Sequence, residues 1–391
     1  MSGLFRKICR WSSGVVAMAV NVFTALILLA SAWGGLMDPV RFPLVGVLCL
    51  GLPIVLPVAL ALFMADAIWW RPSALVMGVA LALAMPVAVD VFPLGTGAFV
   101  DIPGPGPGEK TLTLLTYNCA NFYDMERYDE SVGNRLRNNP TVEFILDSDA
   151  DIVALQESEP LSEMAGTRMT HAAVDSLHLR YPYIVEDEQR GISLLSKYPV
   201  EPILLGMRYE GRSDDKICAY VIDLGERRLT LFSVHLFSFG LTPDDKALYE
   251  DVTNLDDKGE GRRAMLSRVK NSLVSKLSYA ASARSRQASS LAEDIRRFAT
   301  SDVIVCGDFN DVPGCYSLLT LSREGFREVY PAVGRGYMPT FNSDRFYFEI
   351  DHVLWRGSIQ PISLTRPRIF SSDHYPLIVK FKLLPVNDHQ R

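Results

Sequence analysis

Long apolar runs almost free of charge dominate the first hundred residues of this chain. Residues 11–37, 42–65 and 72–89 contain no Asp, Glu, Lys or Arg. A helix that spans a membrane needs about 20 mostly apolar residues. The pattern therefore predicts three transmembrane helices, at about 13–35, 43–65 and 73–93. A cleaved signal peptide would account for one such run but not for three in tandem.

The charges that flank these runs predict an orientation. Basic residues precede the first run and lie between the second and the third (Arg6, Lys7, Arg10, Arg71). Positive charge favours the cytoplasmic side of a membrane. We expect a multi-pass protein of the inner or plasma membrane, with its N-terminus in the cytoplasm. Three crossings would place the rest of the chain in the periplasm or outside the cell.

A different pattern begins near residue 111, where short β-rich runs alternate with helical ones. The predicted strands are 112–118, 151–157, 191–200, 217–224, 228–236, 302–310, 350–356 and 377–383, and the predicted helices are 131–148 and 262–299. Strands with helical connections of this kind favour two packed sheets flanked by helices, an α+β fold. The Pro/Gly sequence IPGPGPGE at 102–109 continues neither a helix nor a strand. We therefore predict an anchor at 1–100, a linker at 101–110 and a catalytic domain at 111–385.

Charge separates the same two parts of the chain. Residues 1–100 carry a net charge of +2 and residues 101–391 a net charge of −8. The composition, 48% hydrophobic with 21% charged residues, excludes a disordered chain. The acidic balance also excludes a uniformly basic nucleic-acid binder. None of the spacings among the six cysteines resembles a disulfide framework or a zinc site, so buried free thiols are expected.

One segment, 237–283, has an uneven charge. Acidic residues are concentrated at 244–257, and residues 258–297 then carry a net charge of +7. Such a basic run could meet phosphate groups or anionic lipid. It could equally be a solvated helix face that pairs with the acidic run before it.

Polar side chains occur where the apolar runs of the second part end. They are Asn118, Glu157, His235, Asp308, Asn310, Asp351, Asp373 and His374. Each alone could be an ordinary turn or helix-capping residue. Together they predict a site, because polar groups at strand ends converge at one edge of a sheet.

This residue set has a chemical logic. The Asn, Asp and Glu side chains offer the hard oxygens that Mg²⁺ or Mn²⁺ prefers. The histidines and further acids can orient groups and transfer protons. There is no Cys/His cluster for zinc, no G-x-S-x-G sequence and no P-loop. The set fits metal-assisted attack of water on a phosphodiester or phosphomonoester.

The order TYN, LQE, SVHL, GDFN, IDH and SDHYP resembles the endonuclease/exonuclease/phosphatase superfamily, which includes DNase I, over about 111–383. The resemblance implies a four-layer αββα sandwich and a phosphoesterase that depends on a divalent metal. It implies a metal-binding set of Asn118, Glu157, Asp308, Asn310 and Asp373. It implies a catalytic set of His235, Asp308, Asn310, Asp351 and His374. Either His374 or Asp308 could be the general base.

The remaining histidines match no site motif of this family. His352 follows Asp351 directly, and adjacent strand residues face opposite ways, so a structural role is expected. His171, His178 and His389 are expected to be ordinary surface residues.

Three functions remain open from the sequence. The first is a membrane-anchored phosphoester hydrolase that acts on a lipid headgroup, a small organophosphate or a nucleic acid. The second is an endo- or exonuclease that the anchor holds at the surface and that degrades DNA or RNA. The third is a binding protein that has kept the fold without activity, which the complete set of catalytic positions disfavours. The expected partners are the lipid bilayer and the phosphate-ester substrate.

Overall fold

A computed structural model describes residues 2–69, 71–95, 110–123, 139–205, 216–239, 261–343 and 346–385. The chain forms two compact units. The N-terminal unit comprises Met1–Phe92, Phe239–Ser285 and Val312–Leu319. The second unit comprises Pro93–Ser238, Arg286–Asp311 and Thr320–Arg391.

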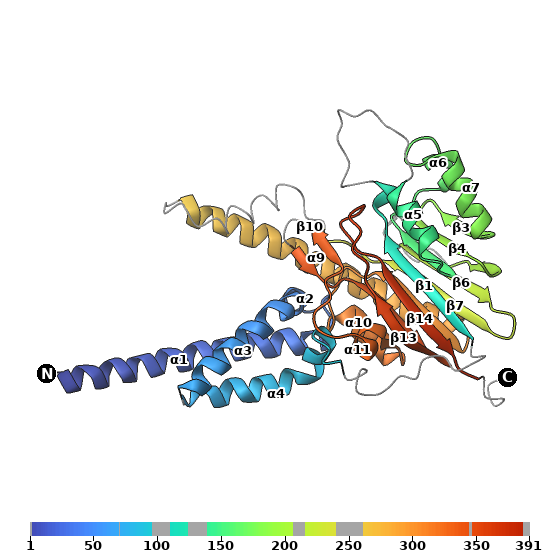
Figure 1. The fold of residues 1–391 in the computed structure, drawn as a ribbon. Coiled ribbons are helices and arrows are strands. Elements are labelled where there is room, and N and C mark those ends of the chain that lie inside the picture. Colours follow the sequence, from blue (N-terminus) through green and yellow to red (C-terminus); the bar gives the residue numbers. More distant parts are fainter. Residues whose placement is uncertain are drawn as a thin grey trace. The chain divides into compact units, whose positions relative to one another are not determined.

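The N-terminal unit contains the apolar helices. They are α1 (Ser2–Trp33), α2 (Pro43–Leu50), α3 (Leu52–Ile68) and α4 (Ser73–Val91), with a short 3-10 helix η1 (Gly34–Leu36) (Figure 1). Among the described residues, Gly14–Leu36 and Ser73–Val91 are each long and apolar enough to cross a membrane. They agree with the first and third predicted spans.

The second predicted span, 43–65, consists of two helices instead of one. Helices α2 and α3 meet at Gly51 with a bend of 61°, so the pair is a third span only if a broken helix crosses. The cause is local. Pro53 lies in the first turn of α3, where its missing N–H does no harm. In an unbroken helix its ring would clash with the carbonyl of Cys49, four residues earlier.

A buried acid holds three parts of the N-terminal unit together. Asp66, near the end of α3, is only 4% exposed. Its carboxylate accepts hydrogen bonds from Asn21 Nδ2 on α1 at 2.8 Å and from Ser73 Oγ at the start of α4 at 2.5 Å. Arg71 adds an ion pair at 3.4 Å. The sequence analysis missed this residue, because the second apolar run ends just before it.

Two segments from the predicted catalytic range, 239–285 and 312–319, belong to the N-terminal unit. Ser282 Oγ donates to the carbonyl of Pro39 at 2.9 Å, and Ser285 Oγ donates to Asp38 at 2.7 Å. Most of the predicted linker 101–110 and the acidic run 244–257 lie outside the described residues. The predicted domain boundaries therefore stay a prediction.

The second unit is built on two six-stranded sheets (Figure 1). The first has the order β13 (Ile359–Thr365), β14 (Leu377–Leu383), β1 (Thr111–Asn118), β2 (Ile152–Gln156), β4 (Ile192–Ser196), β3 (Tyr183–Asp187). The second has the order β5 (Val200–Ile203), β6 (Lys216–Asp223), β7 (Arg228–His235), β8 (Asp302–Asp308), β12 (Asp351–Arg356), β9 (Arg327–Glu328). A separate hairpin pairs β10 (Phe341–Ser343) with β11 (Phe346–Phe348).

The main core lies between the two sheets. It contains Leu114 and Ala154 from the first sheet and Leu231 and Ile304 from the second, all fully buried. These residues alternate along their strands with others that face outward, as β-pleating requires. The outward set of the first sheet packs against α5 (Pro140–Asp147) and α7 (His171–Arg180), which Figure 1 shows beside that sheet.

Further helices belong to the second unit. They are α6 (Leu161–Met164), the C-terminal part of α9 (Gly261–Phe298), part of α10 (Tyr316–Arg323), and α11 (Val329–Val333). The chain leaves α9 through Thr300, whose N–H donates to Thr230 Oγ1 on β7 at 2.9 Å. Two sheets with helices make the α+β sandwich that the sequence predicted.

Most predicted elements are confirmed, with a few differences. The predicted strand 191–200 divides into β4 and the start of β5, and the helical range 262–299 is the single helix α9. Of the predicted helix 131–148, only α5 lies among the described residues. Strands β3, β9, β10, β11 and β13 were not predicted. The five described cysteines, Cys49, Cys119, Cys218, Cys306 and Cys315, are buried and free, as expected.

Strand direction brings the polar strand ends to one place. Strands β1 and β2 run parallel in the first sheet, and β7 and β8 run parallel in the second. The antiparallel strand β12 begins opposite the end of β8, where Asp351 pairs with Asp308. Four carboxyl ends and one amino end therefore lie at the same edge of the sandwich.

Candidate active site

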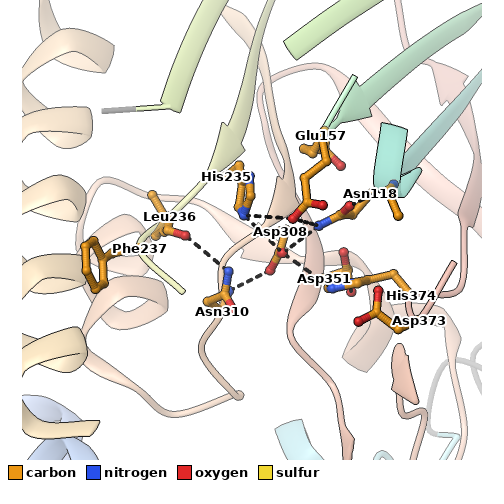
Figure 2. Close-up of polar contacts among 12 residues, drawn as sticks. Asn118, Glu157, His235, Leu236, Phe237, Asp308, Asn310, Asp351, Asp373 and His374 are labelled. Atoms are coloured by element: carbon orange, nitrogen blue, oxygen red, sulfur yellow. Dashed lines mark hydrogen bonds and ion pairs between the residues drawn. The ribbon is translucent and has the colours of Figure 1, made fainter. Parts of the chain in front are cut away.

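The described residues at this edge form one cluster (Figure 2). Asn118 ends β1, and Glu157 directly follows β2. From the second sheet, His235 ends β7 and Asp308 ends β8. All but Glu157 are at most 5% exposed, and the side chain of Glu157 is 40% exposed. The cluster is a set of buried polar groups with one carboxylate open to solvent.

Glu157, and Asn310 in the loop after β8, have an unusual backbone conformation. Glu157 has a φ of 48° and Asn310 a φ of 51°, both in the left-handed region. That region is unfavourable for residues with a side chain and is found often at functional sites. At Glu157 it interrupts the alternation of β2.

Asp308 is the centre of the contacts. Asn118 Nδ2 donates to Asp308 Oδ2 at 3.1 Å and to Glu157 Oε1 at 3.2 Å. The Nε2 atom of His235 lies 3.7 Å from each of the same two oxygens (Figure 2). Asp308 Oδ1 accepts the backbone N–H of Asn310 at 2.9 Å. One carboxylate therefore links both sheets and the loop after β8.

A histidine and an acid form a pair beside Asp308. His374 Nδ1 lies 2.9 Å from Asp351 Oδ2, and its Nε2 lies 3.7 Å from Asp308 Oδ2. The carboxylate of Asp351 can only accept, so the proton of this bond is on Nδ1 of His374. The pair fixes the ring and turns Nε2 toward Asp308.

The two histidines differ in charge. Burial lowers the pKa of His235 to about 3, so this ring is neutral at pH 7. Burial also disfavours the charged form of His374, but the negative charges of Asp351 and Asp308 outweigh it and raise its pKa to about 10. Burial raises the pKa of Asp308 to about 7, against the attraction of His374. The site therefore holds one neutral and one charged imidazole.

Ser372 is a residue that the sequence analysis missed. Its Oγ donates to the backbone carbonyl of Asn118 at 2.9 Å and accepts the N–H of His374 at 3.1 Å. This hydroxyl connects the loop of His374 to the end of β1. The only signal in the sequence is its position two residues before His374. Asp373 between them is half-buried, and Ser372 Oγ lies 3.4 Å from its Oδ1.

The other histidines lie outside this cluster. The His352 ring lies 2.5 Å from Glu328 Oε1 through Nδ1 and 2.8 Å from the carbonyl of Asp311 through Nε2. Both oxygens are acceptors, so the ring donates from both nitrogens. Burial opposes that charge, but Glu328 raises the pKa of His352 to about 9. His171 and His178 are exposed on α7, and His389 lies outside the described residues.

The donor chemistry of the cluster fits a hard divalent cation. The carboxylate oxygens of Glu157 and Asp308 lie in one hydrogen-bonded group with the side-chain amide of Asn118 and the backbone N–H of Asn310. Oxygen ligands of this kind suit Mg²⁺ or Mn²⁺ rather than zinc. The ligand atoms of Asp308, Asp351 and His374 also lie within 4.8 Å of one another. Of the site residues predicted from the sequence, all lie in this cluster except the half-buried Asp373.

Comparison with known families gives two matches. Residues 115–374 match the model of the Endonuclease/Exonuclease/phosphatase family, which covers every residue of the cluster. Residues 14–89 match a family described as Domain of unknown function (DUF8431). Among curated proteins, none matches this chain.

Several solved structures are similar to part of the chain. The human Nocturnin catalytic domain with bound sulfate is 15% identical, with a TM-score of 0.45, over 72% of this chain and 98% of that one. A humanized D. rerio TDP2 is 16% identical, with a TM-score of 0.43, over 69% and 98%. A Bacteroides vulgatus endonuclease/exonuclease/phosphatase is 15% identical, with a TM-score of 0.43, over 70% and 100%.

Proposed function

This chain belongs to the endonuclease/exonuclease/phosphatase family, and from that premise we propose that it is a membrane-anchored phosphoester hydrolase that depends on Mg²⁺ or Mn²⁺. The observation that carries the proposal is the cluster around Asp308. It joins carboxylate oxygens, a neutral histidine and a charged histidine, and both imidazoles lie 3.7 Å from Asp308 Oδ2. Such a combination suits the attack of water on a phosphate ester.

The metal would be held by oxygens of the cluster. Glu157 and Asn118 are the first candidates, because the Glu157 carboxylate is partly exposed and Asn118 touches it. Asp308, Asn310 and Asp373 complete the proposed set. A bound dication would stabilise the negative charge that develops on the phosphate oxygens.

The protein's own groups would do the remaining work. His374, charged and held by Asp351, can donate from Nε2 to an oxygen of the phosphate. His235 is neutral at pH 7, so one of its ring nitrogens can accept a hydrogen bond. Asp308 has a raised pKa and can orient a nucleophilic water or take its proton. Of the two candidates for the general base, Asp308 fits this assignment, because His374 already carries a proton on both ring nitrogens at pH 7.

The test of this function uses the full chain in detergent with bis(p-nitrophenyl) phosphate. We expect hydrolysis with Mg²⁺ or Mn²⁺, loss of the activity with EDTA, and its return when metal is added in excess. Activity undiminished by EDTA would contradict the metal dependence. A substrate screen over plasmid DNA, RNA, phospholipid vesicles and inositol phosphates then separates a nuclease from an enzyme that acts on lipid headgroups or small phosphates.

We propose three membrane crossings, with the N-terminus in the cytoplasm and the catalytic unit on the opposite side. The bent pair α2 and α3 decides this, because a re-entrant pair would leave two crossings and return the chain to the cytoplasm. The basic residues Arg6, Lys7 and Arg10, which precede the apolar span Gly14–Leu36, support a cytoplasmic N-terminus. A C-terminal alkaline phosphatase fusion should be active under this topology. An inactive phosphatase fusion together with a fluorescent cytoplasmic reporter would establish two crossings.

A further inference from the structure

A polar layer lies directly beneath the active-site cluster, between the two sheets. The main core is apolar up to Leu114 on the first sheet and Leu231 on the second. Two residues further along each strand, the inward positions are Thr116 and Ser233, both at most 2% exposed. Two residues beyond these are Asn118 and His235 of the site. The interior therefore changes from apolar to polar one step before the site.

Gln156 connects the two sheets in this layer. Its side chain is fully buried. Its Nε2 lies 3.2 Å from Thr116 Oγ1 on the neighbouring strand β1 and 3.1 Å from Ser233 Oγ on β7 of the facing sheet. The same nitrogen also lies 3.3 Å from the carbonyl of Ala154 on β2, so its two N–H groups are shared among three acceptors, of which Ser233 Oγ is the one on the facing sheet. Strands β2 and β7 are thereby tied through side chains as well as by apolar packing.

The facing sheet is shaped to admit this side chain. Gly307 on β8 has a φ of 133°, and a Cβ atom there would lie 2.1 Å from the carbonyl oxygen of Val234 and 3.1 Å from Gln156 Nε2. An added methyl group would collide with the backbone of β7 and crowd the amide. Glycine is thus required at the position just before Asp308.

We propose that Gln156 is a positioning residue that sets the distance between the two halves of the active site. Glu157 follows it directly on the first sheet, whereas Asp308 and His235 extend from the second. No described backbone hydrogen bond joins the two sheets here, so the spacing of these groups depends on side chains: Asn118 reaches Asp308 within the site, and Gln156 reaches Ser233 directly beneath it. A misplacement of about 1 Å can lower a rate by about 100-fold.

This inference rests on the proposed function, since it assigns Gln156 a part in metal binding and in the rate. The principal variant is Gln156→Met, which keeps the length of the side chain and removes its hydrogen bonds to Thr116 and Ser233. We expect it to weaken Mn²⁺ binding by about 10-fold in calorimetry and to lower kcat by at least about 10-fold, with KM changed less. Ser233→Ala should weaken Mn²⁺ binding and lower kcat in the same way, but by less. It is also the variant to use if Gln156→Met does not fold.

The matched control is Leu229→Ala. Leu229 is fully buried in the same core, at the end of β7 away from the site. Its truncation should lower the unfolding temperature at least as much as Gln156→Met and leave Mn²⁺ affinity and kcat within about twofold of wild type. Equal losses of Mn²⁺ affinity in the two variants would overturn the inference, because a general loss of stability would then explain both.

A double-mutant cycle tests the bridge apart from activity. If Gln156 and Ser233 act through their hydrogen bond, Ser233→Ala should lower the urea midpoint in the wild-type background and have little further effect once residue 156 is changed by Gln156→Met. Additive shifts would show that the bridge contributes nothing. A coupled pair in a protein that neither binds Mn²⁺ nor cleaves bis(p-nitrophenyl) phosphate would contradict the proposed function and leave the bridge intact.

Discussion

Both units of the molecule contain buried aspartates, and Asp66 in one and Asp308 in the other have different surroundings. In the N-terminal unit, Asp66 is 4% exposed and accepts hydrogen bonds from Asn21 and Ser73, with Arg71 as its counter-ion. In the second unit, Asp308 is 1% exposed. It lies among the carboxylates of Glu157 and Asp351 and two histidines, whose Nε2 atoms are 3.7 Å from Asp308 Oδ2.

The difference separates a structural acid from a functional one. Donors from three parts of the unit satisfy Asp66, and such an acid holds helices in place. Asp308 lies where like charges gather, and burial raises its pKa to about 7. Groups of like charge are held together at a cost in free energy, which is typical of a site that a cation or substrate completes.

The largest expected effect comes from Asp308→Asn. The variant keeps the size of the side chain and removes the charge that faces His235 and His374. We expect kcat to fall by at least about 100-fold, as when a catalytic acid, base or charge stabiliser is lost. The measurement is the steady-state rate of bis(p-nitrophenyl) phosphate hydrolysis at saturating Mn²⁺.

Two comparisons make this result specific. Glu157→Ala and His374→Ala should each cause a loss of similar size, because they remove a proposed metal ligand and the charged imidazole. His178→Ala, a change at an exposed histidine of α7, should leave the rate within about twofold of wild type. A wild-type rate for Asp308→Asn would contradict the assignment of Asp308 as a functional acid.

A second prediction concerns His352, a buried charge of the same unit outside the site. Its pKa is raised from an ordinary 6.5 to about 9 by Glu328 in the folded protein. The folded state therefore binds its proton more tightly than the unfolded state does. The stabilisation is fully present below pH 6.5 and is lost as the pH rises through about 9. We expect a loss on the order of 3 kcal/mol in unfolding free energy across this range.

Urea unfolding at pH 6 and pH 9.5 measures this effect. His374 titrates in the same direction, so the informative quantity is the difference between wild type and His352→Gln. The variant should be less stable than wild type at pH 6, and the gap should narrow at pH 9.5. A constant gap at both pH values would show that the charge of His352 contributes nothing to folding.

The parts that the sequence could predict are those that local pattern controls. Alternating apolar residues located most strands, and the polar residues at their ends located the site, because strand direction places such ends at one edge. The helix break at Gly51 was missed because hydropathy does not register the clash of Pro53 with the preceding turn. Membrane spans are recognised in a sequence by their lack of charge, so the second predicted span ended before Asp66 and its buried hydrogen bonds were not predicted.

The missing site residues share a physical reason. Ser372 and Gln156 act through contacts across the fold, Ser372 to the carbonyl of Asn118 and Gln156 to Ser233. Neither contact follows from a residue type or from a spacing along the chain. The raised pKa of Asp308 is also beyond the sequence, because it depends on burial among groups from four strands and a loop.

The smallest effect on catalysis is expected from Asp66→Asn, which completes the comparison. The asparagine can keep an acceptor oxygen at the Oδ2 position for Asn21 and Ser73, but its amide group then takes the place of Oδ1 and faces Arg71, which also donates. An unmatched buried polar group costs about 1–3 kcal/mol. The unfolding temperature in detergent should fall by several degrees, while kcat and Mn²⁺ affinity of the protein that remains folded stay within about twofold of wild type. Asp66→Leu should be less stable still, since it leaves Asn21, Ser73 and Arg71 without an acceptor. If Asp66→Asn instead lowered kcat as Asp308→Asn does, the well-satisfied acid would also be functional, and hydrogen-bond satisfaction would not separate the two kinds of buried acid in this protein.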